Sequence, residues 1–420
     1  MILILAKILV PFLIIFNIIP VLIWLERKGS AYIQDRRGPN RASLFGVIRL
    51  GGMIHSLADV IKLLMKEDIM PARVNKFFYV LAPFTAMTVA CMTFAVIPFA
   101  APMVWEGVNF SFQAADLNAG ILYILAISSL GVFGIMLAGW SSNNKYTLLG
   151  GLRSSAQMIS YEIVMSLAII SVLMMGGSLE LSKVVEDQSV NLLHWNFVRQ
   201  PVACLLFTVA MFAETNRLPF DLPEGESEIV AGYHLEYSSM KFALFFMAEY
   251  ANMIIASAVI SSLFFGGWQI PFASTDFLRA HAGEVLKILL VVLAIGHLCA
   301  GLGLVKRGRK NIKAKKWGDR GDYEALILGM GALGGAFLLA GISAYIWPLI
   351  FTAKASLIIT AVLQVGCFLT KVLFFCWVFI WVRWTLPRFR YDQLMKLGWK
   401  YMMPVSIINI FATGAVMLVK

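Results

Sequence analysis

Long apolar segments recur along the whole 420-residue chain and limit what it can fold into. There are ten, centred on residues 2–24, 77–99, 119–140, 156–175, 199–214, 241–265, 285–305, 325–349, 356–384 and 401–419. About 20 apolar residues in a helix cross the hydrocarbon core of a bilayer, and a helix satisfies its own backbone hydrogen bonds. We therefore expect a single integral membrane domain over 1–420, an all-α polytopic membrane protein with about ten transmembrane helices.

The composition excludes several other classes of protein. The chain is 60% hydrophobic and 14% charged, with a mean hydropathy of +0.79, whereas a soluble protein carries about a quarter charged residues. The net charge of +11 does not indicate nucleic-acid binding, because the bases fall in loops between apolar segments. The five cysteines lie in apolar segments without a CxxC pair, so no metal or iron–sulfur site is predicted.

The basic residues predict the orientation in the membrane. If the loop after the first span is cytoplasmic, the inner segments hold 27 of the 35 Lys and Arg residues. Basic residues favour the cytoplasmic side, so both termini are expected on the outer side of a cell inner membrane. Residues 2–25 lack a small-residue cleavage site and are expected to form the first membrane helix.

Residues 44–66 differ from the apolar spans. Leu50, Ile54, Leu57, Ile61 and Leu64 recur at helical spacing, while the opposite face is polar. This pattern predicts an amphipathic helix lying in the membrane interface.

An acidic loop, residues 214–240, interrupts this otherwise basic chain. It holds a quarter of all the acids and one base, Arg217. The loop is predicted to be cytoplasmic, and Glu249 follows about two turns into the next apolar span. An ionisable residue inside a membrane span is a candidate for function.

Four acids share one depth in the predicted topology, namely Glu26, Glu162, Glu214 and Glu249. At about 1.5 Å per residue, the two deeper acids lie roughly 10–12 Å below the inner surface. Carboxyl groups that share a region raise one another's proton affinity, which suits a proton path. The alternative is that each acid is a structural partner of a loop arginine.

Four sequence blocks resemble the membrane subunit that meets quinone in respiratory complex I, which is called the H subunit in the bacterial NADH:quinone oxidoreductase and subunit 1 in mitochondria. They are YIQDRRGPNR at 32–41, QMISYE at 157–162, AETNRLPFDLPEGESEIVAGYHLEYSSMKFALFFMAEY from Ala213 to Tyr250, and PRFRYDQLMKLGWKYMMP at 387–404. The resemblance implies a translocase subunit with quinone as substrate and no covalently bound cofactor. It implies that FMN and iron–sulfur clusters lie on partner subunits, in a quinone module of the peripheral arm, and that antiporter-like membrane subunits are further partners.

The resemblance also implies roles for single residues. Those matching the acidic channel that leads from the quinone chamber are Glu26, Glu162, Glu214, Glu224 and Glu249. Those matching the chamber itself are Arg36, Asp59, Arg217, Asp221, Glu226 and Glu228. At the inner end of the ninth span, charges of the acidic loop are expected to be answered by Arg383, Arg388, Arg390 and Asp392. Resemblance places this end beside the quinone entrance. Lys371 in that span is expected to pair with an acid or a water file, either structurally or in proton transfer.

Residues 283–350 look like an added pair of helices beside a family core of eight. Gly331 and Gly335 in the eighth span predict a small-residue contact surface, and a dinucleotide site is rejected because no strand precedes these glycines. The basic loop from Lys306 to Arg320 indicates a topology determinant or an anionic-lipid contact, with a docking surface for a partner as the alternative.

Two other functions stay open at this point. A membrane-bound hydrogenase or a formate-hydrogen lyase has a related subunit, although with a less complete match to EGESEIVAGYHLEYSSM. A secondary transporter working alone is the alternative of another class, but the sequence lacks two similar halves and spans broken near mid-membrane.

Overall fold

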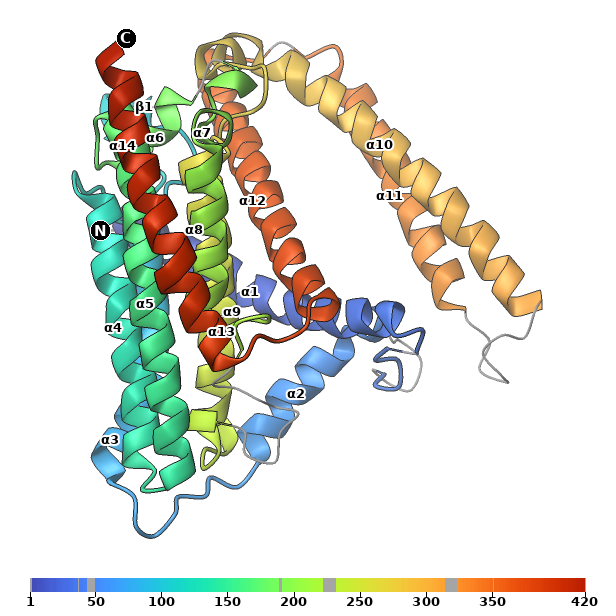
Figure 1. Ribbon diagram of the computed structural model, residues 1–420. Coiled ribbons are helices and arrows are strands. Elements are labelled where there is room, and N and C mark those ends of the chain that lie inside the picture. The colour runs from blue at the N-terminus through green and yellow to red at the C-terminus, as the bar shows by residue number, and fades with distance from the viewer. Residues whose placement is uncertain are drawn as a thin grey trace. The chain divides into compact units, whose positions relative to one another are not determined.

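The structure is a computed structural model, and it describes residues 2–36, 38–43, 50–188, 191–221, 232–313, 323–349 and 351–419 (Figure 1). The long helices are α1 (Ile2–Ile33), α3 (Lys76–Thr93), α4 (Gly120–Ser141), α5 (Lys145–Gly176), α8 (Pro201–Glu214), α9 (Ser239–Phe264), α10 (Thr275–Lys313), α11 (Glu324–Ile346), α12 (Ala353–Thr385) and α14 (Met403–Val419). Shorter helices are α2 (Ile54–Met65), α6 (Leu181–Asp187), α7 (Asn196–Arg199) and α13 (Tyr391–Lys396). Short 3-10 turns are η1 (Leu50–Gly52), η2 (Phe94–Val96), η3 (Leu192–His194) and η4 (Gly232–His234), and η5 (Leu397–Met402) is a π-helix.

Nine helices within these ranges are long and apolar enough to cross a membrane, which confirms the predicted all-α membrane fold. The tenth predicted segment forms α8, a helix of only 14 residues that begins at Pro201. The preceding residue Gln200 has φ −135° and ψ 61°, which is not helical, so the helix cannot extend toward residue 199. The number of spans therefore stays a prediction.

Helix α5 begins earlier than the sequence predicts. Its first residue is Lys145, not residue 156, because Asn144 caps the helix by accepting a 3.0 Å hydrogen bond from the Tyr146 backbone. Gly151 lets this first part pack against α4, since a side chain there would meet Gly139 at 3.3 Å. The polar residues at this end of α5 are thus helical because of their packing, which periodicity alone does not reveal.

The only strands in the described ranges form a hairpin that the sequence analysis missed. Strand β1 (Met103–Trp105) pairs antiparallel with β2 (Val108–Phe110). Gly107 in the turn has φ +81°, a conformation that glycine adopts without strain.

The chain divides into two compact units, and the first holds most of the helices. It consists of residues 1–38, 56–272 and 364–420. In Figure 1, α5 lies beside α4 and α14, and its other neighbour is α8, while α9 contacts α1, α3 and α8. One continuous apolar core runs through this unit, and the stacked rings of Phe212 and Phe379, 4.0 Å apart, join α8 to the second half of α12.

Most of helix α2, from Ser56 on, belongs to this unit. Leu57, Ile61 and Leu64 are each more than half exposed, which suits an apolar face that lies against lipid. Residues 44–49 of the predicted interfacial segment lie outside the described ranges, and its position at the membrane surface stays a prediction.

The second unit consists of residues 39–55 and 273–363, and its main feature is the antiparallel pair α10–α11 (Figure 1). Helix α10 carries a kink at His281, where φ is −116° and ψ is 21°. Gly329 packs against Val305, and a side-chain atom added at Gly335 would lie 3.5 Å from His297. Among the described residues, nothing lies within 4 Å of the position that a Gly331 side chain would take, so the predicted contact at Gly331 stays a prediction.

Candidate functional site

Arg217 lies at the centre of a buried ion cluster in the first unit. It follows the end of α8, and its side chain is only 2% exposed. Its Nη1 is 3.2 Å from Glu26 Oε2 on α1, and its Nε is 2.7 Å from Glu249 Oε1 on α9. The guanidinium carbon also lies 4.3 Å from the ring centre of Tyr250. One side chain therefore holds two membrane helices to the start of the acidic loop.

A second arginine completes the surroundings of Glu26. Arg383 on α12 donates from Nη1 to Glu26 Oε1 over 2.5 Å, and the Tyr250 hydroxyl donates to Oε2 over 2.9 Å. We call Glu26, Arg217, Glu249, Tyr250 and Arg383 the Arg217 cluster. Its two carboxylates and two guanidinium groups balance in formal charge, which is the condition for keeping ions in a low-dielectric interior.

The electrostatics of Arg217 reflect this pairing. Burial works against its charge, but the carboxylates of Glu249 and Glu26 outweigh burial and raise the pKa of Arg217 above its ordinary value. Arg217 is therefore a permanent cation beside both carboxyl groups.

Asp221 forms a neighbouring pair at the end of the same loop segment. Arg388, just beyond α12, donates from Nη2 to Asp221 Oδ2 over 3.1 Å, which confirms that this arginine answers the acidic loop. Burial raises the pKa of Asp221 to about 7, although the Arg388 guanidinium works in the opposite direction. Asp221 can therefore change its charge near neutral pH.

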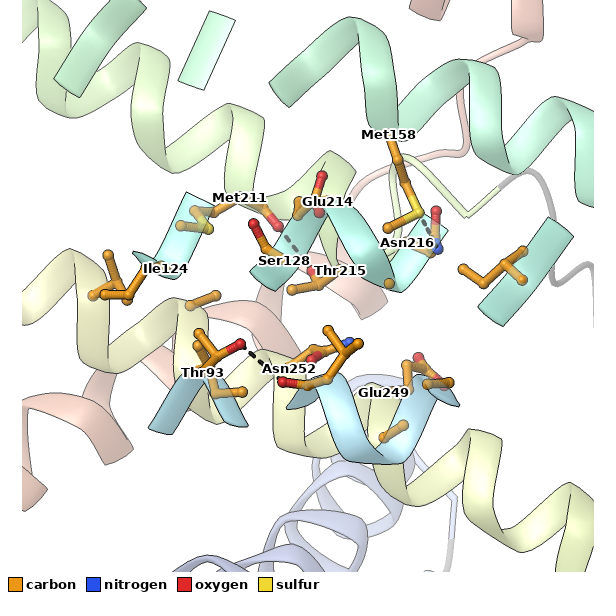
Figure 2. Close-up of a pocket in the computed structure, with 18 of the residues that line it drawn as sticks. Thr93, Ile124, Ser128, Met158, Met211, Glu214, Thr215, Asn216, Glu249 and Asn252 are labelled. Carbon is orange, nitrogen blue, oxygen red and sulfur yellow. Dashed lines mark hydrogen bonds between the residues drawn. The ribbon is translucent and has the colours of Figure 1, made fainter. Parts of the chain in front are cut away.

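A cavity of about 80 Å³ lies between α3, α4, α5, α8 and α9 (Figure 2). Figure 2 shows Glu214, Thr215 and Asn216 along one side of it, with Thr93, Asn252 and Glu249 opposite. One water molecule needs about 10–15 Å³ of cavity volume, and it needs two or more polar groups to hydrogen-bond with. This cavity therefore has room for roughly five waters beside two carboxyl groups.

Glu214 faces this cavity and has no fixed partner among the described residues. Its Oε2 is buried and has no hydrogen bond to any of the residues that the structure describes. Glu249 also lines the cavity while it contacts Arg217, so one side chain joins the cavity to the Arg217 cluster.

A polar network fixes the end of α8 where Glu214 stands. Gln157 on α5 donates to the Ala213 carbonyl over 2.9 Å and to Asn216 Oδ1 over 3.2 Å. Asn216 has φ +51°, a left-handed conformation that asparagine tolerates better than most residues, and this turns the chain from α8 toward Arg217. The QMISYE block thus positions Glu214 through its glutamine.

Glu162 lies on α5 between Met158 and Met165, which both line the cavity, and it is partly exposed. Positions 158, 162 and 165 share one face of a helix. Glu162 is also close enough to Glu214 for the two carboxyl groups to repel each other. The structure therefore brings Glu26, Glu162, Glu214 and Glu249 into one region of the first unit.

Other predicted site residues lie apart from these groups or outside the described ranges. Arg36 lies just beyond the end of α1 and donates to Gln34 and to Ser30, and Asp59 on α2 pairs with Arg27 on α1. Glu224, Glu226 and Glu228 belong to residues 222–231, which the structure does not describe.

Lys371 has a different partner from the expected acid. Its Nζ donates to the carbonyl oxygens of Phe265, Gly267 and Gln269 over 2.7–2.8 Å, and it lies 4.5 Å from the ring centre of Trp195. These carbonyls follow the C-terminal end of α9, where unpaired carbonyls and the helix dipole favour a cation. Its contacts therefore indicate a capping role, and no acid pairs with it among the described residues.

Two variants of Lys371 distinguish a structural capping role from a role in proton transfer. In the Lys371→Met variant, three carbonyls lose a charged donor, and each buried group without a partner costs about 1–3 kcal/mol. We expect thermal unfolding of the isolated assembly at a clearly lower temperature. Lys371→Arg keeps the charge and releases no proton at neutral pH, so it should retain most of the quinone reductase activity that the resemblance of the sequence leads us to expect. Loss of that activity in a stable Lys371→Arg assembly would instead indicate proton transfer.

Sequence reasoning missed three contributors to the site. Tyr250 follows Glu249 in an apolar span and reads as a core residue, while Thr93 and Asn252 are single polar residues in long helices. Their isolation in membrane-spanning sequence was the available signal, because polar groups there need a partner or water.

Comparisons with known proteins give the family context. A family model described as NADH dehydrogenase matches residues 6–305 and 317–414. The H 1 subunit of the NADH-quinone oxidoreductase of Solibacter usitatus is 44% identical over 416 residues, 98% of this chain and 95% of that protein. The H subunit of the NADH-quinone oxidoreductase of Salinibacter ruber is 43% identical over 401 residues, 94% of this chain and 91% of that protein. NADH-quinone oxidoreductase subunit 8 of Rhodothermus marinus is 42% identical over 407 residues, 96% of this chain and 94% of that protein.

Proposed function

Because this chain belongs to the NADH dehydrogenase family, with the H subunits of NADH-quinone oxidoreductase, we propose that it couples quinone reduction to proton translocation through its buried carboxyl groups. It supplies the membrane wall and the lipid-side entrance of the quinone chamber. The observation that carries this proposal is the cavity in which Glu214 and Glu249 meet space for water, directly beside the Arg217 cluster.

The chemistry of quinone explains why such groups are needed. Reduction of a quinone to a quinol takes up two electrons and two protons. Electrons come from NADH through FMN and iron–sulfur clusters on partner subunits of the peripheral arm. Protons and compensating charge must come from groups near the quinone head, and Asp221 supports this role because its pKa of about 7 lets it give up a proton near neutral pH.

When Asp221 loses its proton, the Arg217 cluster transmits the change in charge to the cavity. Arg217 stays charged, so a change at Asp221 alters the balance that holds Glu249. Glu249 and Glu214 then exchange protons through water in the cavity, with Glu162 as the next carboxyl group. The altered protonation of these carboxyl groups is passed on to antiporter-like partner subunits. The chain works in a cell inner membrane with both termini on the outer side.

Replacing Asp221 by asparagine tests the proposal through its pH dependence. Asparagine has no proton to give up, whereas the wild-type carboxyl group holds one below its pKa of about 7. We therefore expect NADH:quinone reductase activity at least about tenfold below wild type at pH 6 and within about threefold of wild type at pH 8, where the wild-type group is already mostly ionised. NADH oxidation by ferricyanide, which reports on the partner subunits, should stay unchanged at both pH values.

Asp187→Asn is a matched control, because Asp187 pairs with Arg199 in a part of the chain away from the Arg217 cluster. Its activity relative to wild type should not vary with pH. An Asp221→Asn assembly with the same relative activity at pH 6 and pH 8 would argue against titration of Asp221 in the reaction.

A further inference from the structure

The helix pair α10–α11 is held together through glycines on one face of α10. Gly301 lies against Leu333, and Gly308 lies against the backbone of Leu326, each so closely that an added side chain atom would fall 2.8 Å away. Close packing through small residues is the usual way in which helices associate inside lipid. The contact with α11 therefore uses the glycine face of α10, and the other faces of the two helices are turned away from this contact.

Those other faces are apolar over a length that matches a bilayer. Val292, Leu302 and Phe337 are each more than half exposed. No Asp, Glu, Lys or Arg occurs in 288–305 or in 325–346. At about 1.5 Å per residue, the uncharged part of α10 is roughly 27 Å long, close to the roughly 30 Å hydrocarbon core.

A stripe of bases begins where this apolar part of α10 ends. Lys306, Arg309, Lys310 and Lys313 are exposed and fall within about 100° of arc around the helix, on a face turned away from Gly308. We call these four residues the basic stripe. Arg309, Lys310 and Lys313 line a surface depression, and no acid pairs with the stripe among the described residues.

Neither the helix dipole nor the part of the sequence matched by the family model accounts for the basic stripe. The dipole acts within the last turn, which includes Lys310 and Lys313 but leaves out Lys306. Residues 306–316 lie between the two ranges that the family model matches. Over residues 306–324 the sequence has eight bases and three acids, so this end of the pair is strongly positive.

We propose that the basic stripe binds the headgroups of anionic phospholipids in the leaflet at this end of α10. The stripe begins at the predicted boundary between acyl chains and headgroups, and long basic side chains extend from such a boundary to phosphate groups. This makes the helix pair a lipid anchor with a preference for negative charge. The proposal does not depend on the role of the buried carboxyl groups.

The test uses the isolated native assembly in phosphatidylcholine nanodiscs with a small fraction of photoactivatable lipid. One sample contains photoactivatable phosphatidylglycerol and the other contains photoactivatable phosphatidylcholine. Peptides from the second half of α10 should be labelled at least about fivefold more by phosphatidylglycerol, and about 1 M salt should reduce this preference.

Variants then locate the labelled site. Replacing Arg309, Lys310 and Lys313 by glutamine should lower phosphatidylglycerol labelling at least about threefold. The matched control replaces Arg279, Lys287 and Lys354 by glutamine, which removes the same charge from other parts of the same unit and should leave the labelling unchanged. Equal labelling by both lipids, full labelling in the first variant, or cross-linking of these peptides to a partner protein in place of lipid would overturn the proposal. The comparison of the two lipids on the wild-type assembly needs no variant and so does not depend on how the variants fold.

Discussion

Replacing Arg217 by glutamine is expected to reduce the amount of intact assembly several-fold and to abolish quinone reductase activity in what remains. The variant leaves Glu26 and Glu249 inside the protein with one fewer buried cation. Removing one partner of a buried ion pair costs about 3–5 kcal/mol, and here a single side chain serves two carboxylates. The measurement is the yield of assembly on a native gel together with NADH:quinone reductase activity per assembly.

Two comparisons make this result specific. Arg217→Lys keeps the charge but loses the planar contact with two carboxylates and a ring, so it should assemble better than Arg217→Gln while staying well below wild type in activity. Arg279→Gln removes a partly exposed arginine that pairs with the exposed Asp276, and surface pairs contribute about 0–1 kcal/mol, so assembly and activity should be close to wild type. Wild-type yield and activity in Arg217→Gln would show that the cluster does not hold the site together.

Replacing Glu214 by glutamine should separate proton coupling from assembly. Glutamine has nearly the same shape, and Glu214 Oε2 has no hydrogen bond to lose among the described residues, so the assembly should form in normal amounts. The amide does not take up a proton near neutral pH. We therefore expect quinone reductase activity and proton pumping at least about tenfold below wild type, since acid–base groups contribute about 10²–10⁴-fold. NADH oxidation by ferricyanide should persist.

Control variants again bound the interpretation. Glu214→Asp keeps a carboxyl group at the cavity and should recover part of the activity. Glu284→Gln changes an exposed acid on α10 and should have no effect. If Glu214→Gln pumped protons at the wild-type rate, the cavity carboxyl groups would be structural partners only.

The sequence predicted the helices well because their apolar composition is a local property. The ends of α5 and α8 differ from the prediction because they depend on a cap at Asn144, close packing at Gly151 and the backbone at Gln200. These features involve contacts or dihedral angles that hydropathy does not encode.

Counting residues placed four acids at one depth but did not predict their partners. The shared depth of Glu26, Glu162, Glu214 and Glu249 followed from counting residues along helices, and the structure brings the four together. The partner of Glu26 was not predictable in this way, because Arg217 and Arg383 lie 191 and 357 positions away in the chain. Which distant side chains meet is decided by how the helices pack.

The partner of Lys371 was not predictable from the sequence either. Its depth correctly indicated that it needs a partner, and an acid was the natural expectation. The structure supplies backbone carbonyls that follow α9, which exist only because that helix ends inside the protein. The sequence thus shows that a buried charge needs a partner, but it does not show which group the partner is.

Proton translocation during quinone reduction is the measurement that tests the central claim most directly. The native assembly would be isolated through a tag on this chain, reconstituted into liposomes, and supplied with NADH and a quinone, with and without a quinone-site inhibitor. We predict inhibitor-sensitive quinone reduction accompanied by proton translocation. An assembly that oxidises NADH with ferricyanide and reduces quinone but moves no protons across sealed membranes would contradict this claim.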